Sequence, residues 1–467
     1  MKKRTKIVCT LGPACDKVEI LVKMIGAGMN VARLNFSHGS HENHKALFDN
    51  VREAARQTGE PIAILQDLQG PKIRVGALPE AGVVLTPGAQ IVFDTALAEY
   101  AGEAIPVDYH ELHQYLKAGE RLLLNDGKME TQIVSVEGTR IITTVKAGGD
   151  LTSHKGINVP DSTLTVRAMS DKDKDDARFG LSLGVDFIAL SFVRNAQDIL
   201  DLRKILDDEA IVKNISQNPP IKIIAKIERR EAVENIESIL EVVDGIMVAR
   251  GDLGLEIPGE QVPVIQKQLT MLGIKYSKPV IVATQMMDSM EHSPRATRAE
   301  VSDVANAVID HTGAVMLSNE SAVGQYPVET VQTMSNILTE TEASKYDDLP
   351  LEIHEAKGES VNKSMEELGR LMAEKVGASA IVLWDSNEEF ARIMSSFRPE
   401  LPIFAPARDE RTLHQLNLSW GVIPIFAEAN SVSEFLTQVK IYFEKNNIEA
   451  HEVVVVTSAS LEIHPLA

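Results

Sequence analysis

The sequence has few cysteines and no long run of apolar residues. Its 467 residues include only Cys9 and Cys15, which excludes a disulfide scaffold and indicates a reducing compartment. No stretch approaches the roughly 20 apolar residues of a membrane span. The N-terminal segment MKKRTKIVCTLGP is basic, but its apolar part is too short for a signal peptide. We therefore expect a cytoplasmic protein without a membrane segment.

The sequence also lacks an excess of positive charge. Lys and Arg number 47 against 67 Asp and Glu, which gives a formal net charge of -20. Such a chain is not attracted to a nucleic-acid backbone, so we expect no nucleic-acid partner. A basic pocket for a phosphorylated metabolite is still compatible with this charge, because net charge says little about one cleft.

Short apolar runs recur along the first 317 residues, and most gaps between them carry the helical period of three and four. Eight strands alternating with helices predict an α/β fold with a (β/α)₈ TIM barrel. A doubly wound open sheet has the same local pattern, but the count of eight and the polar strand ends favour the barrel. The eight runs are Lys6–Cys9, Asn30–Leu34, Ile62–Leu65, Phe187–Phe192, Ile221–Ile227, Gly245–Ala249, Pro279–Ala283 and Ala314–Leu317.

One gap is too long for a strand–helix connection, since 187 − 67 = 120 positions separate Asp67 from Phe187. Its middle holds short β-rich runs between Asn-Asp-Gly, Glu-Gly and Gly-Gly turns. We expect a small β-barrel lid domain at 72–160, inserted between barrel parts at 1–71 and 161–345. A lid at this place could close over the barrel mouth.

A further α/β open-sheet domain is expected at 346–467. A helix near Glu359–Lys375 precedes four apolar runs with helical patterns between them. The segment YDDLPLEIHEAKGES is the expected linker. The four strands are expected at Ala380–Trp384, Pro402–Pro406, Val422–Phe426 and Glu452–Thr457.

The fifth expected strand ends in two charged residues. Alternation places Ile224, Lys226 and Glu228 on one face and Ile223 and Ile227 on the other. An ammonium and a carboxylate therefore point the same way at the carboxyl end of the strand, the edge where parallel α/β proteins bind ligands. A lone Lys-x-Glu pair is usually a solvated ion pair.

The next strand ends in Arg250-Gly251-Asp252, which adds a second carboxylate beside an exposed backbone N–H. Other strand ends carry further polar residues, each of which alone could be a helix cap. Together they supply cations, carboxylates and hydroxyls for phosphoryl transfer on an acidic substrate. These residues are Arg33, Asn35, Ser37, His38, Asp67, Arg74, Thr284 and Ser318.

Several strings resemble the pyruvate kinase family. MVARGDLG, VATQMMDSM and TRAEVSDVANAV are long and specific, and KIE and ARLNFSHG agree with them. The resemblance covers nearly the whole barrel and the insert, whereas the last hundred-odd residues match in layout but poorly in motif. It implies a kinase of the last step of glycolysis, which transfers the phosphoryl group of phosphoenolpyruvate to ADP. It also implies a homotetramer.

The resemblance implies a role for each site residue. Glu228 and Asp252 would hold Mg²⁺ or Mn²⁺, and Lys226 and Arg33 would contact the phosphoryl group. The N–H groups of Gly251 and Asp252, with Thr284, would hold the substrate carboxylate. Thr284 and Ser318 would protonate the enolate through water. The residues implied for the nucleotide are Asn35, Phe36, Ser37, His38, Arg74 and Lys155.

One departure concerns the monovalent cation, for which family members use positions matching Asn35, Ser37 and Asp67. Leu68 stands where potassium-dependent members have a hydroxyl ligand, and Lys72 stands where they have glutamate. An ammonium could supply the charge of K⁺, so we expect that K⁺ is not required. The alternative is that Lys72 is a surface residue and the site still binds K⁺.

Two loops beside the eighth strand also depart from the family. Asp310-His311-Thr312-Gly313 and Ser318-Asn319-Glu320-Ser321 each replace a glycine, and Ala296 replaces a proline. Each lost glycine removes a residue that takes positive φ without strain. These changes could slow the enzyme or alter its nucleotide fit.

The C-terminal domain departs furthest. Asp385-Ser386-Asn387-Glu388-Glu389 would repel phosphate, and TSASLEIHPLA has no glycine. We expect that fructose bisphosphate does not activate at this site.

Two other functions remain open from the sequence. A barrel lyase or aldolase acting on pyruvate or phosphoenolpyruvate would also use Glu and Asp on one metal, but would not need Lys155 or the Arg74 segment. A catalytically impaired paralogue with a regulatory or binding role would explain the altered loops. The presence of Lys226, Glu228 and Asp252 weighs against it.

Overall fold

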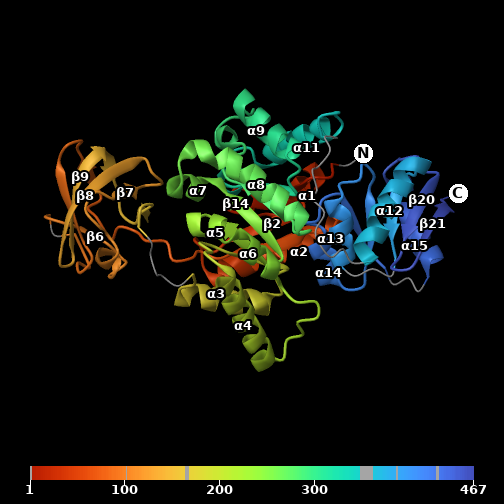
Figure 1. Ribbon diagram of the computed structural model, residues 1–467, viewed down its shortest axis with the longest axis horizontal. Helices are drawn as coiled ribbons and strands as arrows, with labels where there is room; N and C mark the ends of the chain where they lie inside the picture. The colour runs from red at the N-terminus through yellow and green to blue at the C-terminus, as the bar shows by residue number, and fades with distance from the viewer. Residues whose placement is uncertain are drawn as a thin grey trace.

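Three bodies lie in a row along the molecule: an all-β insert, a central barrel and a C-terminal α/β domain (Figure 1). The computed structural model describes residues 3–100, 102–162, 168–347, 361–384, 388–427 and 431–466. Within these ranges, no helix has the length and apolar character needed to cross a membrane.

The central body is a closed barrel of eight parallel strands, ordered β1-β16-β15-β14-β13-β12-β3-β2. Closure confirms the barrel and excludes the open sheet that the sequence pattern also allowed. The expected strand positions agree with the observed ones within two residues at each end. The strands are β1 (Lys6–Thr10), β2 (Val31–Asn35), β3 (Ala63–Asp67), β12 (Phe187–Leu190), β13 (Lys222–Ile227), β14 (Gly245–Ala249), β15 (Val280–Ala283) and β16 (Ala314–Leu317).

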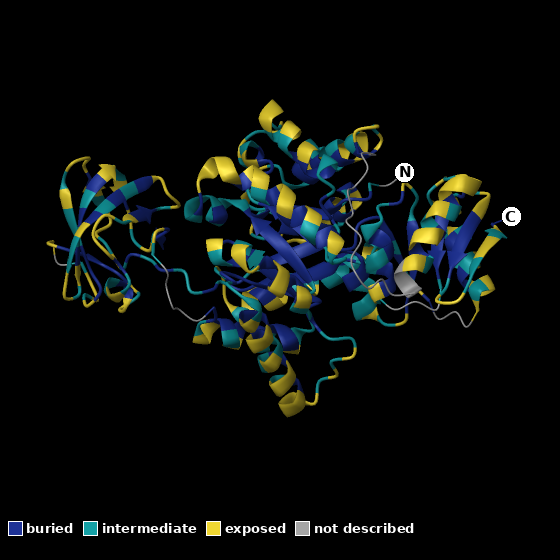
Figure 2. Ribbon diagram, viewed as in Figure 1, coloured by how far each residue is buried: buried dark blue, intermediate teal, exposed yellow. Residues whose placement is uncertain are grey.

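Alternate residues of each barrel strand face the interior and the helices, as the period of a strand requires. Ile224 packs in the barrel interior, whereas Ile223 and Ile227 pack in the layer between strands and helices. The predicted alternation in β13 is therefore confirmed. Figure 2 shows the barrel strands buried and the outer faces of the surrounding helices exposed.

The helices around the barrel begin with capping side chains at several places. Ser40 and Ser170 form capping boxes at the starts of two of them. The periodic stretch after β13 forms two short helices, because Asn235 interrupts the helical dihedral angles. The α-helices of this body are α1 (Val18–Ala27), α2 (His41–Thr58), α3 (Asp171–Leu183), α4 (Ala196–Lys213), α5 (Arg230–Glu234), α6 (Ile236–Val242), α7 (Arg250–Glu256), α8 (Val262–Lys275), α9 (Arg298–Ile309), α10 (Asn319–Ala322) and α11 (Pro327–Glu342). Three short 3₁₀ helices accompany them: η1 (Leu112–Gln114) in the insert, and η2 (Gly259–Gln261) and η3 (Asp288–Glu291) in the barrel.

The insert follows β3 and contains a six-stranded and a two-stranded sheet around one apolar core. The tip turn at Asn125–Gly127 comes close to the barrel, since a Cβ on Gly127 would lie 2.7 Å from Leu255 Cδ2 of α7. The insert thus reaches over the mouth of the barrel. Its strands are β4 (Val83–Leu85), β5 (Gln90–Asp94), β6 (Ile105–Pro106), β7 (Arg121–Leu124), β8 (Met129–Glu137), β9 (Arg140–Ala147), β10 (Gly149–Leu151) and β11 (Ile157–Asn158).

The C-terminal domain is a five-stranded sheet in the order β19-β18-β17-β20-β21. Four strands were expected, and the edge strand β21 was missed because its burial does not alternate. The domain docks at the amino ends of the barrel strands, where Leu418 packs with the barrel interior. Its elements are α12 (Val361–Val376), β17 (Ala380–Leu383), α13 (Glu388–Ser396), β18 (Ile403–Ala407), α14 (Glu410–Leu416), β19 (Val422–Phe426), α15 (Val432–Lys445), β20 (Glu452–Val456) and β21 (Leu461–Pro465).

Candidate active site

Lys226 is the centre of the polar cluster at the carboxyl end of the barrel. Its Nζ lies 3.0 Å from Glu228 Oε1 and 3.2 Å from Asp67 Oδ1, and it donates to Ser191 Oγ at 2.8 Å. Burial by itself lowers the pKa of Lys226, but the charges of Asp67 and Glu228 outweigh it and raise the pKa. The ammonium is therefore always charged and held from three sides.

Arg33 lies on the neighbouring side of Asp67. Its Nε donates to Asp67 Oδ2 at 2.6 Å, and its Nη1 donates to Thr10 Oγ1 at 2.7 Å. Burial raises the pKa of Asp67, but Arg33 and Lys226 reverse this and leave the pKa below its ordinary value. One buried carboxylate thus orders two cations, which is the arrangement needed to neutralise a transferring phosphoryl group.

Glu228 is held by the loop after β12. Its Oε2 accepts the backbone N–H of Phe192 at 2.7 Å. Burial raises the pKa of Glu228, Lys226 opposes this shift and Asp252 adds to it. Ser191, which sequence reasoning missed, donates to the carbonyl oxygen of Leu68 at 2.6 Å. Its position directly after a strand is the signal that could have identified it.

Thr284 follows β15 and meets the start of α7. Its Oγ1 accepts the N–H of Gly251 at 2.8 Å, and its backbone has φ of +72°. Arg250 donates to the carbonyl oxygen of Thr284 at 2.6 Å. The sequence analysis placed Arg250 among the charged groups at the strand end but gave it no role. In the structure its guanidinium donates hydrogen bonds to the backbone of this loop.

Ser318 lies at the end of β16, close in sequence to Glu320. The two oxygens of the buried Glu320 carboxylate accept the N–H groups of Ser318 at 2.7 Å and of Met287 at 3.1 Å. Glu320 therefore joins the loops after β15 and β16, the two loops that carry Thr284 and Ser318. Its spacing from Ser318 within SNES is the signal in the sequence.

The segment expected to face the nucleotide is only partly available to a ligand. Phe36 is buried and stacks on His44 with ring centroids 3.8 Å apart, so its side chain is not available. Asn35 Oδ1 accepts the N–H of Ser37 at 3.1 Å, while His38 is exposed. The backbone of Phe36 is also engaged, because its N–H donates to the carbonyl oxygen of Asp67 and its carbonyl oxygen accepts from Lys172. The structure thus leaves only Ser37 and His38 accessible in this turn.

Arg74 and Lys155 lie together on the two chain segments that join the insert to the barrel. Arg74 Nη1 donates to the carbonyl oxygen of His154 at 3.0 Å, and Val75 donates its N–H to the carbonyl oxygen of Lys155 at 2.9 Å. The two residues are 81 positions apart in sequence, yet the structure brings their chain segments together.

Lys72 lies between the insert and the barrel. Its Nζ is 3.2 Å from Asp126 Oδ1 in the tip turn of the insert and 3.8 Å from Asp252 Oδ1. Leu68 is buried, 1% exposed, and its side chain has no polar atom, while its carbonyl oxygen accepts the hydroxyl of Ser191. The ammonium of Lys72 is therefore part of the cluster.

The carboxylates of Glu228 and Asp252 are the donors that suit a divalent ion. No group of three or more His, Cys, Asp or Glu side chains within the described ranges could hold a metal by itself. Two carboxylate donors, with the remaining oxygens from substrate and water, fit Mg²⁺ or Mn²⁺ better than a metal held by protein ligands alone. Asp252 keeps 27% of its side chain exposed, which leaves it open to such a ligand.

The two altered loops lie at opposite ends of β16. Residues 310–313 precede the strand and lie beside the C-terminal domain, where Arg398 donates to the carbonyl oxygen of His311 at 2.5 Å. Both loops lie beside the eighth strand, but this turn is at the end opposite to Ser318. His311 takes φ of +62° despite its side chain, whereas Asn319 begins a helix. In the effector loop, residues 385–387 lie outside the described residues.

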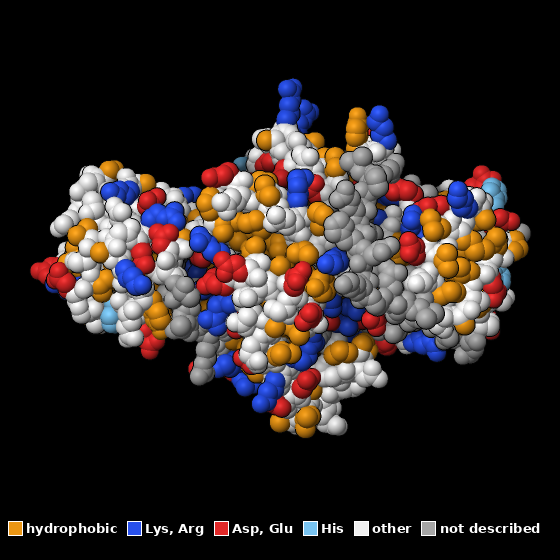
Figure 3. Space-filling model, viewed as in Figure 1, with side chains coloured by type: hydrophobic (Ala, Val, Ile, Leu, Met, Phe, Trp, Pro, Cys, Tyr) orange, Lys and Arg blue, Asp and Glu red, His pale blue; other side chains and the backbone are white. Residues whose placement is uncertain are grey.

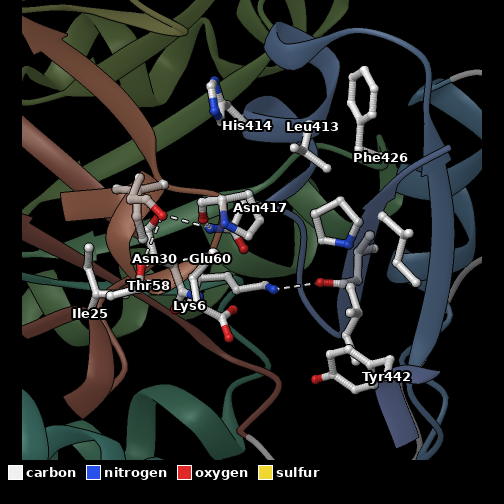
Figure 4. A pocket seen from close by; sticks show the side chains of 18 of the residues that line it. Lys6, Ile25, Asn30, Thr58, Glu60, Leu413, His414, Asn417, Phe426 and Tyr442 are labelled. Atoms are coloured by element: carbon white, nitrogen blue, oxygen red, sulfur yellow. Dashed lines mark hydrogen bonds between the residues drawn. The ribbon is translucent and has the colours of Figure 1, made fainter. Parts of the chain in front are cut away.

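A large cavity lies away from this cluster, between the amino end of the barrel and the C-terminal domain. It has a volume of about 1860 Å³. Figure 4 shows Lys6 and Asn417 among its lining residues, where Lys6 donates to the carbonyl oxygen of Val422 at 2.7 Å and Asn417 to that of Asn30 at 3.0 Å. These bonds join the two domains, and no residue of the catalytic cluster lines the cavity.

Comparisons with known proteins agree with this geometry. Residues 2–331 match the family described as "Pyruvate kinase, barrel domain", and residues 367–463 match "Pyruvate kinase, alpha/beta domain". The chain is 41% identical over 461 residues to a pyruvate kinase of Staphylococcus saprophyticus, covering 98% of this chain and 78% of that protein. It is 42% identical over 470 residues to a pyruvate kinase of Geobacillus stearothermophilus, with 99% and 78% coverage.

A solved structure gives the same result. The crystal structure of a pyruvate kinase from Cryptosporidium parvum superposes with a TM-score of 0.92 at 35% identity, covering 100% of this chain and 96% of that one. The match extends over the barrel, the insert and the C-terminal domain together. The chain therefore belongs to the pyruvate kinase family and is an enzyme, a pyruvate kinase.

Proposed function

We propose that this enzyme transfers the phosphoryl group of phosphoenolpyruvate to ADP with Mg²⁺ or Mn²⁺, and that it does so without K⁺. The observation that carries the proposal is the cluster of Arg33, Lys226 and Glu228 around the buried Asp67. It offers two preorganised cations beside a carboxylate that can share a metal with Asp252.

The two cations would bear the developing negative charge of the transferring group. Arg33 and Lys226 are both fixed by Asp67, at 2.6 Å and 3.2 Å, so little reorganisation is needed when the phosphoryl group moves. Glu228 and Asp252 would hold the divalent ion, which neutralises phosphate charge in such reactions. The cluster thus binds the substrate phosphate and stabilises it in transfer.

Thr284 and Gly251 would hold the carboxylate of the three-carbon substrate. The hydroxyl of Thr284 accepts the Gly251 N–H, so its own proton is available for donation to a ligand. Ser318 directly follows the next strand, β16, and would help to protonate the enolate through water. Arg74, Lys155 and the turn at 35–38 would face the nucleotide, because they border the same mouth.

Independence from K⁺ is supported by the surroundings of Lys72. Its ammonium already lies 3.8 Å from Asp252. The side chain of Leu68 has no oxygen, and its carbonyl oxygen already accepts the hydroxyl of Ser191 at 2.6 Å. Asp67 and Asn35 use their side-chain oxygens within the protein, in bonds to Arg33, Lys226 and Ser37. A monovalent cation would have to compete with these partners and with the charge of Lys72.

Homotetrameric assembly and a cytoplasmic location complete the proposal. Edge strand β21 offers unpaired backbone groups on its outer side, a position that favours pairing with another chain. Figure 3 shows hydrophobic side chains gathered over the middle of this face of the molecule. On α8, Val264 and Met271 are more than half exposed. Cys9 and Cys15 are both free thiols, which fits a reducing compartment.

The test is pyruvate formation from phosphoenolpyruvate and ADP with Mg²⁺, first without K⁺ and then with it. Lys226→Met should lower kcat by about 100-fold or more, because it removes a preorganised cation. Lys222→Met is the matched control, since Lys222 lies on the same strand and pairs with Glu388 at 3.1 Å. Turnover only after K⁺ is added would keep the reaction and reject the role of Lys72. Absence of turnover in both buffers would favour the impaired paralogue.

A further inference from the structure

Asp303 of α9 forms a bidentate ion pair with Arg250. Its Oδ1 accepts from Arg250 Nη1 at 2.8 Å, and its Oδ2 lies 2.8 Å from Arg250 Nη2. A planar guanidinium held at two points by a carboxylate has a fixed orientation. Asp303 belongs to the string TRAEVSDVANAV, to which the site described above gives no role.

The guanidinium of Arg250 also donates hydrogen bonds to the loop after β15. Arg250 Nη2 donates to the carbonyl oxygen of Thr284 at 2.6 Å, and Nε donates to that of Ala283 at 3.3 Å. Thr284 and Gln285 have φ of +72° and +54°. Left-handed backbone at residues other than glycine is strained and persists only where surrounding contacts hold it.

This backbone conformation determines where the hydroxyl of Thr284 lies. The hydroxyl accepts the Gly251 N–H at 2.8 Å and donates to no group within the described ranges. Its proton is therefore left for a ligand in the barrel mouth. If Thr284 adopted a right-handed backbone conformation, its hydroxyl would lose the hydrogen bond from Gly251. The hydroxyl proton would then no longer point into the barrel mouth.

Two other carboxylates hold later parts of the same loop. Glu320 accepts the N–H of Met287 at 3.1 Å, and Glu300 accepts the N–H of Ser289 at 2.7 Å. Neither contact involves Asp303, so we expect both to remain when it is replaced. The effect of Asp303 is therefore confined to the first residues of the loop, where Thr284 lies.

We propose that Asp303 is a positioning residue of this enzyme: through the guanidinium of Arg250 it holds Thr284 in left-handed backbone, with the hydroxyl proton set for the carboxylate or enolate oxygen of the three-carbon substrate. The inference rests on the role proposed above for Thr284. Asp303 itself does not touch the substrate.

The first experiment compares substitutions on α9. Asp303→Ala should lower kcat/KM for phosphoenolpyruvate by about 30- to 100-fold, because small misplacements of a substrate-orienting group are costly. The KM for ADP should change by less than about twofold, since the nucleotide residues lie on other loops. Asp303→Glu, which restores a carboxylate, should recover part of the loss. A rise in the KM for ADP as large as the rise in the KM for phosphoenolpyruvate would overturn the proposal.

Asp310→Asn is the matched control, because it removes an ion pair of α9 that joins this helix to α8 instead of to Arg250 of α7. Asp310 ends the same helix and pairs with Lys267 of α8, without contacting Arg250. Its kinetics should equal those of the wild type. If Asp303→Ala does not fold, Asp303→Asn keeps an oxygen for one of the two Arg250 bonds, and its loss should be smaller but confined to phosphoenolpyruvate.

A double-mutant cycle separates the pathway through Thr284 from a general structural effect. In the Thr284→Ala background, Asp303→Ala should cost less than about threefold, because coupled residues do not add. The same large factor in both backgrounds would overturn the inference while leaving the role of Thr284 intact. If Thr284→Ala alone keeps full kcat/KM, the proposed role of Thr284 is wrong, and the inference falls with it.

Discussion

The Nζ atom of Lys72 lies 3.8 Å from Oδ1 of Asp252, although 180 positions separate the two residues. The same ammonium lies 3.2 Å from Asp126 in the tip turn of the insert. A fixed positive charge thus stands between the insert and a carboxylate proposed to bind the divalent ion. The charge near Asp252 therefore depends on where the insert lies.

Lys72→Glu should make the enzyme dependent on K⁺. Without the ammonium, turnover in K⁺-free buffer should fall about tenfold or more, since a preorganised charge is lost. Added K⁺ should restore part of the rate, and the titration of kcat against K⁺ measures it. Lys117→Glu, which makes the same charge change at an exposed position of the insert, should stay independent of K⁺. A Lys72→Glu enzyme that is indifferent to K⁺ would contradict the proposal.

Glu228→Gln should weaken the use of the divalent ion. The substitution keeps the shape of the side chain but removes the charge that attracts a hard cation, so the Mg²⁺ concentration for half-maximal rate should rise about tenfold or more. Glu234→Gln, an exposed residue of α5 at the same end of the barrel, is the control. An unchanged Mg²⁺ titration in Glu228→Gln would show that the metal binds elsewhere.

Gly70→Ala should disturb two catalytic side chains at once. Gly70 has φ of +71°, and a Cβ there would lie 2.7 Å from Phe192 Cδ2 and 2.8 Å from Ser191 Cβ. Ser191 bonds to Lys226 and Phe192 bonds to Glu228, so the methyl group should lower kcat as well as stability, the latter by about 1–3 kcal/mol.

Gly88→Ala separates backbone strain from crowding. Gly88 also has positive φ, +84°, but a Cβ there would meet no atom within 4 Å. It should lose stability through strain alone, by about 1 kcal/mol, and keep kcat. Equal kcat in the two variants, measured beside their thermal unfolding, would show that Ser191 and Phe192 do not depend on the space at Gly70.

Asp347 should make the junction between barrel and C-terminal domain sensitive to pH. Burial raises the pKa of Asp347 from 3.8 to about 7, Arg4 at 3.2 Å opposes the shift, and Glu342 and Glu400 add to it. The folded state therefore binds this proton more tightly than the unfolded state. Its contribution to stability is complete below about pH 4 and is lost as the pH rises through 7.

Asp347→Asn should remove this dependence. The difference in free energy of unfolding between the wild type and the variant should decline from pH 4 to pH 7, by at most about 1.4 kcal/mol per pH unit. Denaturant unfolding at several pH values measures it. Parallel curves for the two proteins would contradict the assignment.

Fructose bisphosphate should not activate at the loop that precedes α13. Glu388, the first residue of that helix, already pairs with Lys222 of the barrel at 3.1 Å, and Glu389 adds a second carboxylate. Both charges oppose a phosphate group. A titration of the rate at subsaturating phosphoenolpyruvate should be flat. Strong activation that is abolished by substitutions in 385–389 would overturn this expectation.

The chain by itself determined the eight strands, their positions and the face on which Lys226 and Glu228 lie. These features depend on local periodicity, because the alternation of buried and exposed residues in a strand can be recognised from consecutive residues of the sequence. The polar residues after the strands were also predictable, since the carboxyl ends of parallel strands share one edge. The family strings then implied the chemistry.

Only the tertiary structure decided which side chains contact each other. The pairing of Asp67 with both Arg33 and Lys226, the grip of Arg250 on Thr284 and the approach of Lys72 to Asp252 join strands far apart in sequence. These contacts depend on barrel closure, on the placement of the insert and on rotamers. Local periodicity predicts none of these three features, because it indicates which face of a helix or strand is buried and not which residues that face contacts.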